Sequence, residues 1–274
     1  MRDRCADTTV LNMARESSEL AFFGVLAIVF AASAAVTVTW CAPMAAMGDM
    51  SMPGGWTMSM AWMRMPGQTW LDAATSFVGM WLVMMMAMML PALVPMLWRY
   101  RKSLPRTGAM RLGWLTALVG IGYFWVWIMF GITAFPAGAL LATLEMRSPA
   151  LALAVPLAVG VVVLIAGTLQ FTTWKSYHLD CCRKELGCGH GSSTSAGSAL
   201  RHGLRLGLQC SACCGNLMVV PLVVGVMDLR AMAVVTIAIT VERLAPGGER
   251  LARAIGVVLV GAGLFLMARA AALV

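Results

Sequence analysis

Long apolar stretches run through most of this chain and restrict it to a membrane fold. Of its 274 residues, 60% are hydrophobic and 12% charged, whereas a soluble domain is about half apolar and about a quarter charged. A helix that crosses a bilayer needs roughly 20 mostly apolar residues. Seven stretches are candidates, and the sixth is short: 20–41, 72–98, 112–135, 150–171, 205–227, 229–241 and 254–273. The sequence therefore predicts an all-α, polytopic transmembrane helix bundle of about seven spans.

The stretches also divide the chain into regions. The first could be a cleaved signal peptide, but its apolar core exceeds the roughly 7 to 15 residues of a signal peptide, which favours a retained anchor. We expect a cytoplasmic N-terminus (1–19), a transmembrane anchor (20–41), an extracytoplasmic Met-rich loop (42–70) and a six-span metal-binding domain (71–273). Within the last region, residues 172–204 form a polar loop that contains Cys and His.

The basic residues predict the orientation of these spans. Sixteen of the twenty Lys and Arg fall in the N-terminus and in segments 99–111, 175–205 and 243–253, which lie on the same side of the predicted bundle. Such a bias marks the cytoplasmic side, so the N-terminus is predicted to be cytoplasmic. Because the basic residues are spread over alternate loops, the net charge of +8 does not indicate nucleic-acid binding.

Methionines crowd the predicted outer loop. Eight of them fall within residues 44–65, interleaved with tryptophans and glycines. Flexible thioethers bind soft ions, and monovalent copper is the first candidate. The alternative is an interfacial segment whose Met and Trp side chains rest on lipid. The candidate ligands here are Met58, Met60, Met63 and Met65.

A second group of methionines follows in the next apolar stretch. Met80, Met84 and Met88 are four residues apart and so share a helix face, with Met85 and Met89 beside them. Two adjacent thioether columns could pass a soft ion inward, although methionine is also an adaptable filler of helix cores. The candidate ligands are Met84, Met85 and Met88.

A cluster of His and Cys lies near the opposite side of the predicted bundle. Cys210, Cys213 and Cys214 have the spacing i, i+3, i+4, which places three sulfurs on one helix face. Thiolates select soft ions, and cytoplasmic cysteines stay reduced rather than form disulfides. The alternative is that these cysteines are small buried hydrophobes. The candidate ligands are His178, Cys181, Cys182, Cys210, Cys213 and Cys214, with Cys188 and His190 as weaker auxiliary candidates.

Charged and aromatic residues near these ligands are expected to support the site or the packing of the helices. Lys175 and several arginines give the cysteines a positive setting that favours thiolate. Glu242 and Arg243 end the sixth stretch, and we expect them to pair with one another or with a ligand-bearing helix. Tyr123, in the third stretch, is expected to pack among other aromatic rings.

Four strings, in order, resemble a bacterial family of uncharacterised proteins described as predicted metal-binding integral membrane proteins. They are Met85-Met-Ala-Met-Met-Leu-Pro91, Lys175-x-x-His178-Leu-x-x-Cys182-Arg183, Gly203-x-x-x-Gly207-x-x-Cys210-x-x-Cys213-Cys214-x-x-Leu-Met218 and Gly225-Val-Met-Asp-Leu229, followed by Glu242. The resemblance covers roughly residues 70 to 265. The family has Cys where this chain has His178, and Asn where it has Asp228. The resemblance implies a metal-binding protein of the bacterial inner membrane.

Three hypotheses about function follow. The first is capture, transfer or homeostasis of monovalent copper, with lipid, the metal ion and a periplasmic metal chaperone or membrane complex as partners. The second is a membrane thiol or quinone oxidoreductase in which Cys210 and Cys213 cycle as a pair. The third is an accessory subunit of a membrane metalloenzyme. The sequence contains no glycine-rich nucleotide-binding loop, which argues against an ATP-driven pump.

Overall fold

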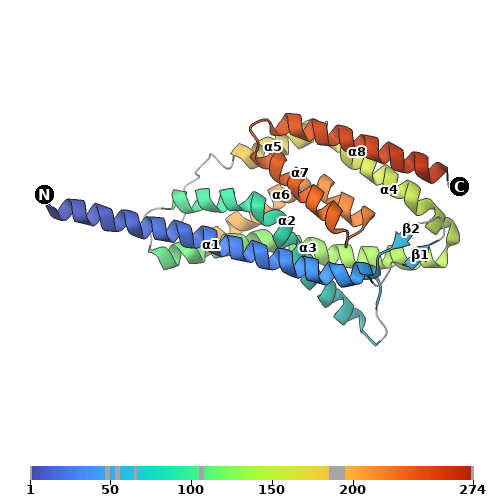
Figure 1. Cartoon of the computed structure of the whole chain (residues 1–274), viewed down its shortest axis with the longest axis horizontal. Coiled ribbons are helices and arrows are strands. Elements are labelled where there is room, and N and C mark those ends of the chain that lie inside the picture. The colour runs from blue at the N-terminus through green and yellow to red at the C-terminus, as the bar shows by residue number, and fades with distance from the viewer. Residues whose placement is uncertain are drawn as a thin grey trace.

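A computed structural model describes residues 2–46, 50–52, 56–64, 67–104, 108–184 and 195–272, with the backbone alone at 2–16, 43–46, 50–52, 57–58, 60 and 183–184. This part of the chain forms a helical bundle (Figure 1). Its helices are α1 (Arg2–Ala46), α2 (Trp70–Ser103), α3 (Ala109–Arg147), α4 (Pro149–Leu169), α5 (Thr173–Lys184), α6 (Ala196–Val224), α7 (Leu229–Leu244) and α8 (Gly248–Ala271).

Six helices of the described chain are long and apolar enough to cross a membrane. They are the segment Ser17–Ala42 of α1 and the whole of α2, α3, α4, α6 and α8. The predicted all-helical, polytopic fold is therefore confirmed. The sixth predicted span is α7, whose 16 residues fall short of the roughly 20 that a crossing needs. The bundle thus has six helices of spanning length rather than seven.

Local sequence explains why α7 is short. Asp228 caps its N-terminus, and Oδ1 of this residue accepts hydrogen bonds from the backbone N–H groups of Arg230 and Ala231 at 2.8 and 3.1 Å. It ends just before Pro246, and its last turn carries the buried side chains of Glu242 and Arg243. The helix packs against α2, α6 and α8, so both charged groups lie inside the bundle.

Glycines set the closest helix contacts. A Cβ atom at Gly160 of α4 would lie 2.6 Å from Met267 Cγ of α8, and one at Gly263 of α8 would lie 2.7 Å from Leu164 N of α4. Only glycine allows such an approach of two backbones. Accordingly α4 and α8 lie side by side (Figure 1).

Helix α6 meets α3 in the same way. A Cβ atom at Gly207 would lie 2.8 Å from Val126 Cγ2, and one at Gly203 would overlap the backbone oxygen of Val119. Since Cys210 lies one turn beyond Gly207 on α6, this contact fixes the position of the cysteines relative to α3.

The basic segments gather at one end of the bundle. The end of α2 meets the start of α6 where the rings of Tyr100 and His202 stack with centroids 5.2 Å apart. The end of α4 meets the end of α7, where Gln170 Nε2 donates to Glu242 Oε1 at 2.7 Å. The clustering agrees with the predicted charge bias, while the assignment of this end to the cytoplasm stays a prediction.

The Met-rich segment lies near the other end of α3 and α4. It contains the short antiparallel strands β1 (Met50–Met52) and β2 (Trp56–Met58), followed by a turn of 3-10 helix (Met60–Trp62). Trp56 Nε1 donates to the carbonyl oxygen of Ala152 at 2.8 Å, near the start of α4. The described part of the segment is therefore anchored on the bundle.

Candidate metal centre

Four cysteine sulfurs meet between α5 and α6, and we call Cys182, Cys210, Cys213 and Cys214 the thiol centre. Cys210 and Cys214 are one helical turn apart, and their Sγ atoms are separated by 3.8 Å. Cys213 lies next to Cys214 on α6 and, across the helix interface, close enough to the Cys182 thiol for each to affect the ionisation of the other. All four are at most 2% exposed. The helical spacing accounts for three of these sulfurs, and the fourth comes from a separate helix.

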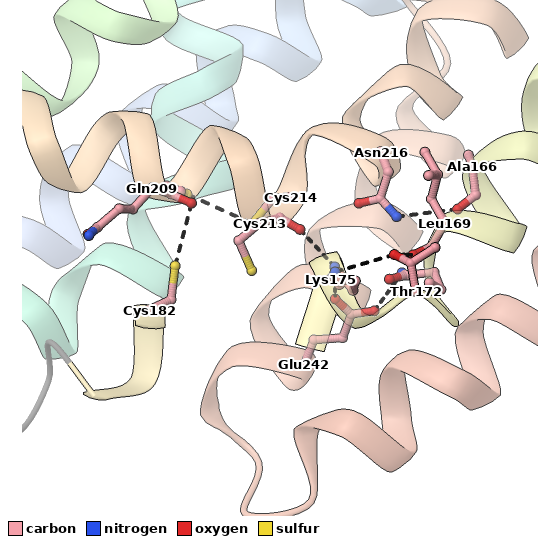
Figure 2. A network of polar contacts seen from close by, with 12 residues as sticks. Ala166, Leu169, Thr172, Lys175, Cys182, Gln209, Cys213, Cys214, Asn216 and Glu242 are labelled. Carbon is pink, nitrogen blue, oxygen red and sulfur yellow. Dashed lines mark hydrogen bonds and ion pairs between the residues drawn. The ribbon is translucent and has the colours of Figure 1, made fainter. Parts of the chain in front are cut away.

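Helix α5 brings Cys182 to the other three cysteines. A turn at residues 170–172 ends α4 and starts α5, which then packs on α6. Cys182 Sγ donates to the carbonyl oxygen of Gln209 at 3.5 Å, as Figure 2 shows. The neighbouring Cys213 sulfur, together with burial, raises the pKa of the Cys182 thiol well above its ordinary value. Cys182 is therefore a neutral thiol.

A buried ion pair fastens α5 beside the thiol centre. Lys175 Nζ donates to Glu242 Oε2 of α7 and to the carbonyl oxygen of Cys213, both at 2.8 Å (Figure 2). Gln170 Nε2 donates to the other carboxylate oxygen. Because both carboxylate oxygens and the ammonium group are hydrogen-bonded, this network joins α4, α5, α6 and α7 at one point.

A second buried cation contacts sulfur directly. Arg243 is 4% exposed, and its Nη1 donates to Cys210 Sγ at 3.0 Å, while its Nη2 donates to Met96 Sδ at 3.4 Å. Tyr123 Oη also donates to Cys210 Sγ, at 3.0 Å. Cys210 therefore receives hydrogen bonds from α3 and α7, which is a setting that favours a thiolate.

His178 and Cys181 are less buried on α5 than Cys182. The imidazole of His178 packs against the rings of Trp174 and Tyr177, with centroids 4.5 and 5.4 Å away. Cys181 is hydrogen-bonded to Tyr177. Both residues are half-buried, and in the described chain their contacts are with these aromatic side chains. Cys188 and His190 lie outside the described residues.

The predicted methionine ligands are placed in two regions. Met84, Met85 and Met88 are buried in α2, at 5%, 0% and 3% exposure. Met63 is half-buried beside the 3-10 turn. For Met58 and Met60 the structure describes only the backbone, and Met65 lies outside the described residues.

The described residues include no group of three or more His, Cys, Asp or Glu side chains already arranged to hold a metal ion. The four sulfurs instead form a row of neighbours. Cys182 lies next to Cys213, Cys213 next to Cys214, and Cys214 next to Cys210. The 3.8 Å between Cys210 and Cys214 is less than twice a zinc–thiolate bond of about 2.3 Å, so two sulfurs can share one ion. The donor set is soft and fits monovalent copper, with small movements needed to close around it.

Sequence reasoning missed the second layer of this centre. Tyr123 and Met96 contact the cysteines or their cation, and neither was expected to do so. Glu242 pairs with Lys175 of α5, so the expected pairing with a ligand-bearing helix is confirmed and the pairing with Arg243 is not formed. One feature of the sequence could have indicated these contacts. Ionisable residues such as Arg243 fall within apolar segments, where they are costly and need specific partners.

These observations define a multi-pass helical membrane protein with a buried cluster of soft ligands. Residues 78–266 match the family model PpoB2, described as a copper chaperone, so the chain belongs to this copper chaperone family. The match contains α5, α6 and α7 and leaves out α1 and the Met-rich segment. No curated protein and no solved structure gave a match. The predicted copper function is confirmed at the level of the family.

Proposed function

We propose that this membrane protein holds monovalent copper at the thiol centre and receives it from the Met-rich segment through α2. The observation that carries the proposal is the convergence of four buried sulfurs from α5 and α6. Soft thiolates favour monovalent copper, and the family is one of copper chaperones. The centre would therefore be the place where the copper cargo is held before transfer.

The charges around the centre suit such a cargo. One copper ion held by two thiolates carries one net negative charge, which needs a partner in a buried setting. The Lys175–Glu242 pair is neutral as a unit. Arg243, beside Cys210, supplies the balancing positive charge.

The methionines supply a route toward this centre. Met84, Met85 and Met88 are buried along α2, and thioethers bind monovalent copper more weakly than thiolates would, which favours passage over retention. Met58, Met60, Met63 and Met65 would capture the ion at the outer end. His178 and Cys181 would serve as ligands near the exit on α5.

The location follows from the charge bias. With the basic end in the cytoplasm, the protein would span the bacterial inner membrane, with the thiol centre near the cytoplasmic side and the Met-rich segment facing the periplasm. A periplasmic metal chaperone or a membrane complex would then be the partner at the outer end.

The oxidoreductase alternative has less support. It needs Cys210 and Cys213 to act as a pair, whereas the Cys210 sulfur contacts that of Cys214 at 3.8 Å, and Cys213 neighbours Cys182. The family match to a copper chaperone also favours binding over thiol chemistry.

Copper titration of the purified, reduced protein tests the proposal. We expect joint replacement of Cys210, Cys213 and Cys214 by Ser to remove tightly bound copper. Cys41→Ser is the matched control, because that cysteine is also buried but lies on α1 and contacts Met227 Sδ. It should leave the tight site in place. Unchanged copper stoichiometry in the triple variant would refute the thiol centre as the copper site.

A further inference from the structure

Arg243 joins two sulfurs that belong to different parts of the copper route. Its guanidinium is buried and donates to Met96 Sδ of α2 and to Cys210 Sγ of α6. Among the ion pairs of the described residues, Arg243 has no carboxylate partner. A buried cation whose contacts are a thioether and a thiol is an unusual arrangement, since a buried charge ordinarily requires an acidic partner.

Both sulfurs are neighbours of one small planar group. The two Nη atoms belong to one planar guanidinium, so Met96 Sδ and Cys210 Sγ both lie within hydrogen-bonding distance of the same small group. An ion that replaced this head would meet a thioether and a thiolate. That pair of ligands suits a soft monovalent ion.

Met96 also continues the buried methionines of α2. It follows Met89 by seven residues, which is close to two helical turns, and so lies on the same face. Met89 is fully buried and Met96 is 7% exposed. Met96 is therefore placed between the thioethers of α2 and the thiol centre.

We propose that Met96 and Cys210 form a further copper-binding position, through which the ion passes between α2 and the thiol centre, and that Arg243 occupies it in the metal-free protein. The proposal rests on the copper route described above. A copper ion and a guanidinium carry like charges, which repel strongly at short range in a buried setting. The ion can bind Met96 only when the guanidinium leaves that sulfur, so Arg243 limits the rate of exchange.

The first test measures copper exchange in the full-length protein loaded with one equivalent of monovalent copper. A soluble copper(I) chelator is the acceptor, and the rate of transfer is recorded. Met96→Leu keeps the volume of the side chain and should slow transfer about tenfold without lowering the copper stoichiometry. Met86→Leu is the matched control, because Met86 is only half-buried on the same helix, and it should leave the rate unchanged.

The second test reads the ligands directly. In selenomethionine-labelled protein, Arg243→Gln should remove the hydrogen bond to the selenium atom of residue 96. That atom can then bind copper, and X-ray absorption at the copper edge should show copper–selenium scattering. The same scattering should be absent from the double variant Arg243→Gln, Met96→Leu. Arg243→Gln should also speed transfer, and the added Met96→Leu should cancel that gain, since residues that share a contact are not additive.

The outcomes separate this position from the thiol centre. If the triple cysteine variant keeps full copper stoichiometry, the proposed function fails, and this position fails with it. If the cysteines do bind copper but Met96→Leu leaves the transfer rate unchanged, the position at Met96 is wrong while the thiol centre stands. Should Arg243→Gln not fold, the Met96→Leu and Met86→Leu pair decides the matter alone.

Discussion

Lys175 shows how one residue holds several elements of the protein together. Its ammonium group and the carboxylate of Glu242 have side-chain exposures of 1% and 2%. Removing one member of a buried pair leaves an uncompensated charge, which is far more costly than losing an exposed pair. The ion pair is therefore a point at which the stability of the protein and the position of α5 are linked.

Replacement of Lys175 by Met tests this link. We expect the free energy of unfolding to fall by about 3–5 kcal/mol, because Glu242 is left buried without its cation. The double variant Lys175→Met, Glu242→Gln should regain much of that loss. Denaturation in detergent, followed by circular dichroism, measures both.

The exposed pair Arg253–Glu249, 4.0 Å apart on α8, provides the control. Arg253→Met should cost less than about 1 kcal/mol. A Lys175 variant as stable as this control would show that the buried pair does not fasten α5.

At the residue scale, sequence alone predicted part of the site. The spacing of Cys210, Cys213 and Cys214 indicated one helix face, and the structure places all three together. The family string names Cys182 and not Cys181, but it could not give the contacts of Cys182 with α6 or of Cys181 with Tyr177, because these depend on how α5 packs on α6. The contacts of Arg243 with Met96 and Cys210 are tertiary as well, so no local pattern predicts them.

Among the elements, α6 depends on its close approach to α3. A Cβ atom at Gly203 would overlap the backbone of Val119, whereas one at Gly215 of the same helix would meet no atom within 4 Å. These two glycines differ in their surroundings and not in their helix. They form a matched pair for testing the helix contact.

We expect Gly203→Ala to push α6 away from α3, lowering stability by about 1–3 kcal/mol, as overpacking does. Because Cys210 lies two turns further along α6, copper affinity should fall as well. Gly215→Ala should be neutral or stabilising by up to about 1 kcal/mol, since alanine favours the helix. Thermal unfolding and copper competition measure the two effects, and equal behaviour of the variants would contradict the contact.

The Met-rich segment is an element whose role the family match does not cover. Replacing Met58, Met60, Met63 and Met65 by Leu keeps apolar volume at a cost of under about 1.5 kcal/mol for each swap, but removes every thioether. We expect normal folding and reduced cellular copper uptake or tolerance. Normal copper content at both limiting and excess copper would mean that these methionines only contact lipid.

The orientation of the whole molecule in the membrane is a separate prediction. With the basic end in the cytoplasm, a membrane-impermeant thiol reagent applied to intact cells should not label Cys188. It should label a cysteine that replaces Ser51. Permeabilised cells are the control, since both positions should then react. The reverse pattern would invert the proposed direction of copper movement.

At this scale, composition predicted the class of fold well. Apolar length identified every helix that is able to span the bilayer, because each backbone polar group in lipid must be satisfied within its own helix. The helix α5, which lies within the expected polar loop, was less predictable. Its position depends on buried polar contacts, such as those of Glu242 with Gln170 and Lys175, that form only when the helices come together.

Burial of the thiol centre also determines how the protein meets oxidants. Sulfur oxidation depends on thiolate character and on exposure. Of the six described free cysteines, five are buried and Cys181 is half-buried. Among the described cysteines, we therefore expect peroxide to react with Cys181 before it reaches the thiol centre behind α5. Burial would then keep the copper-binding sulfurs reduced under oxidative stress for longer than the half-buried Cys181.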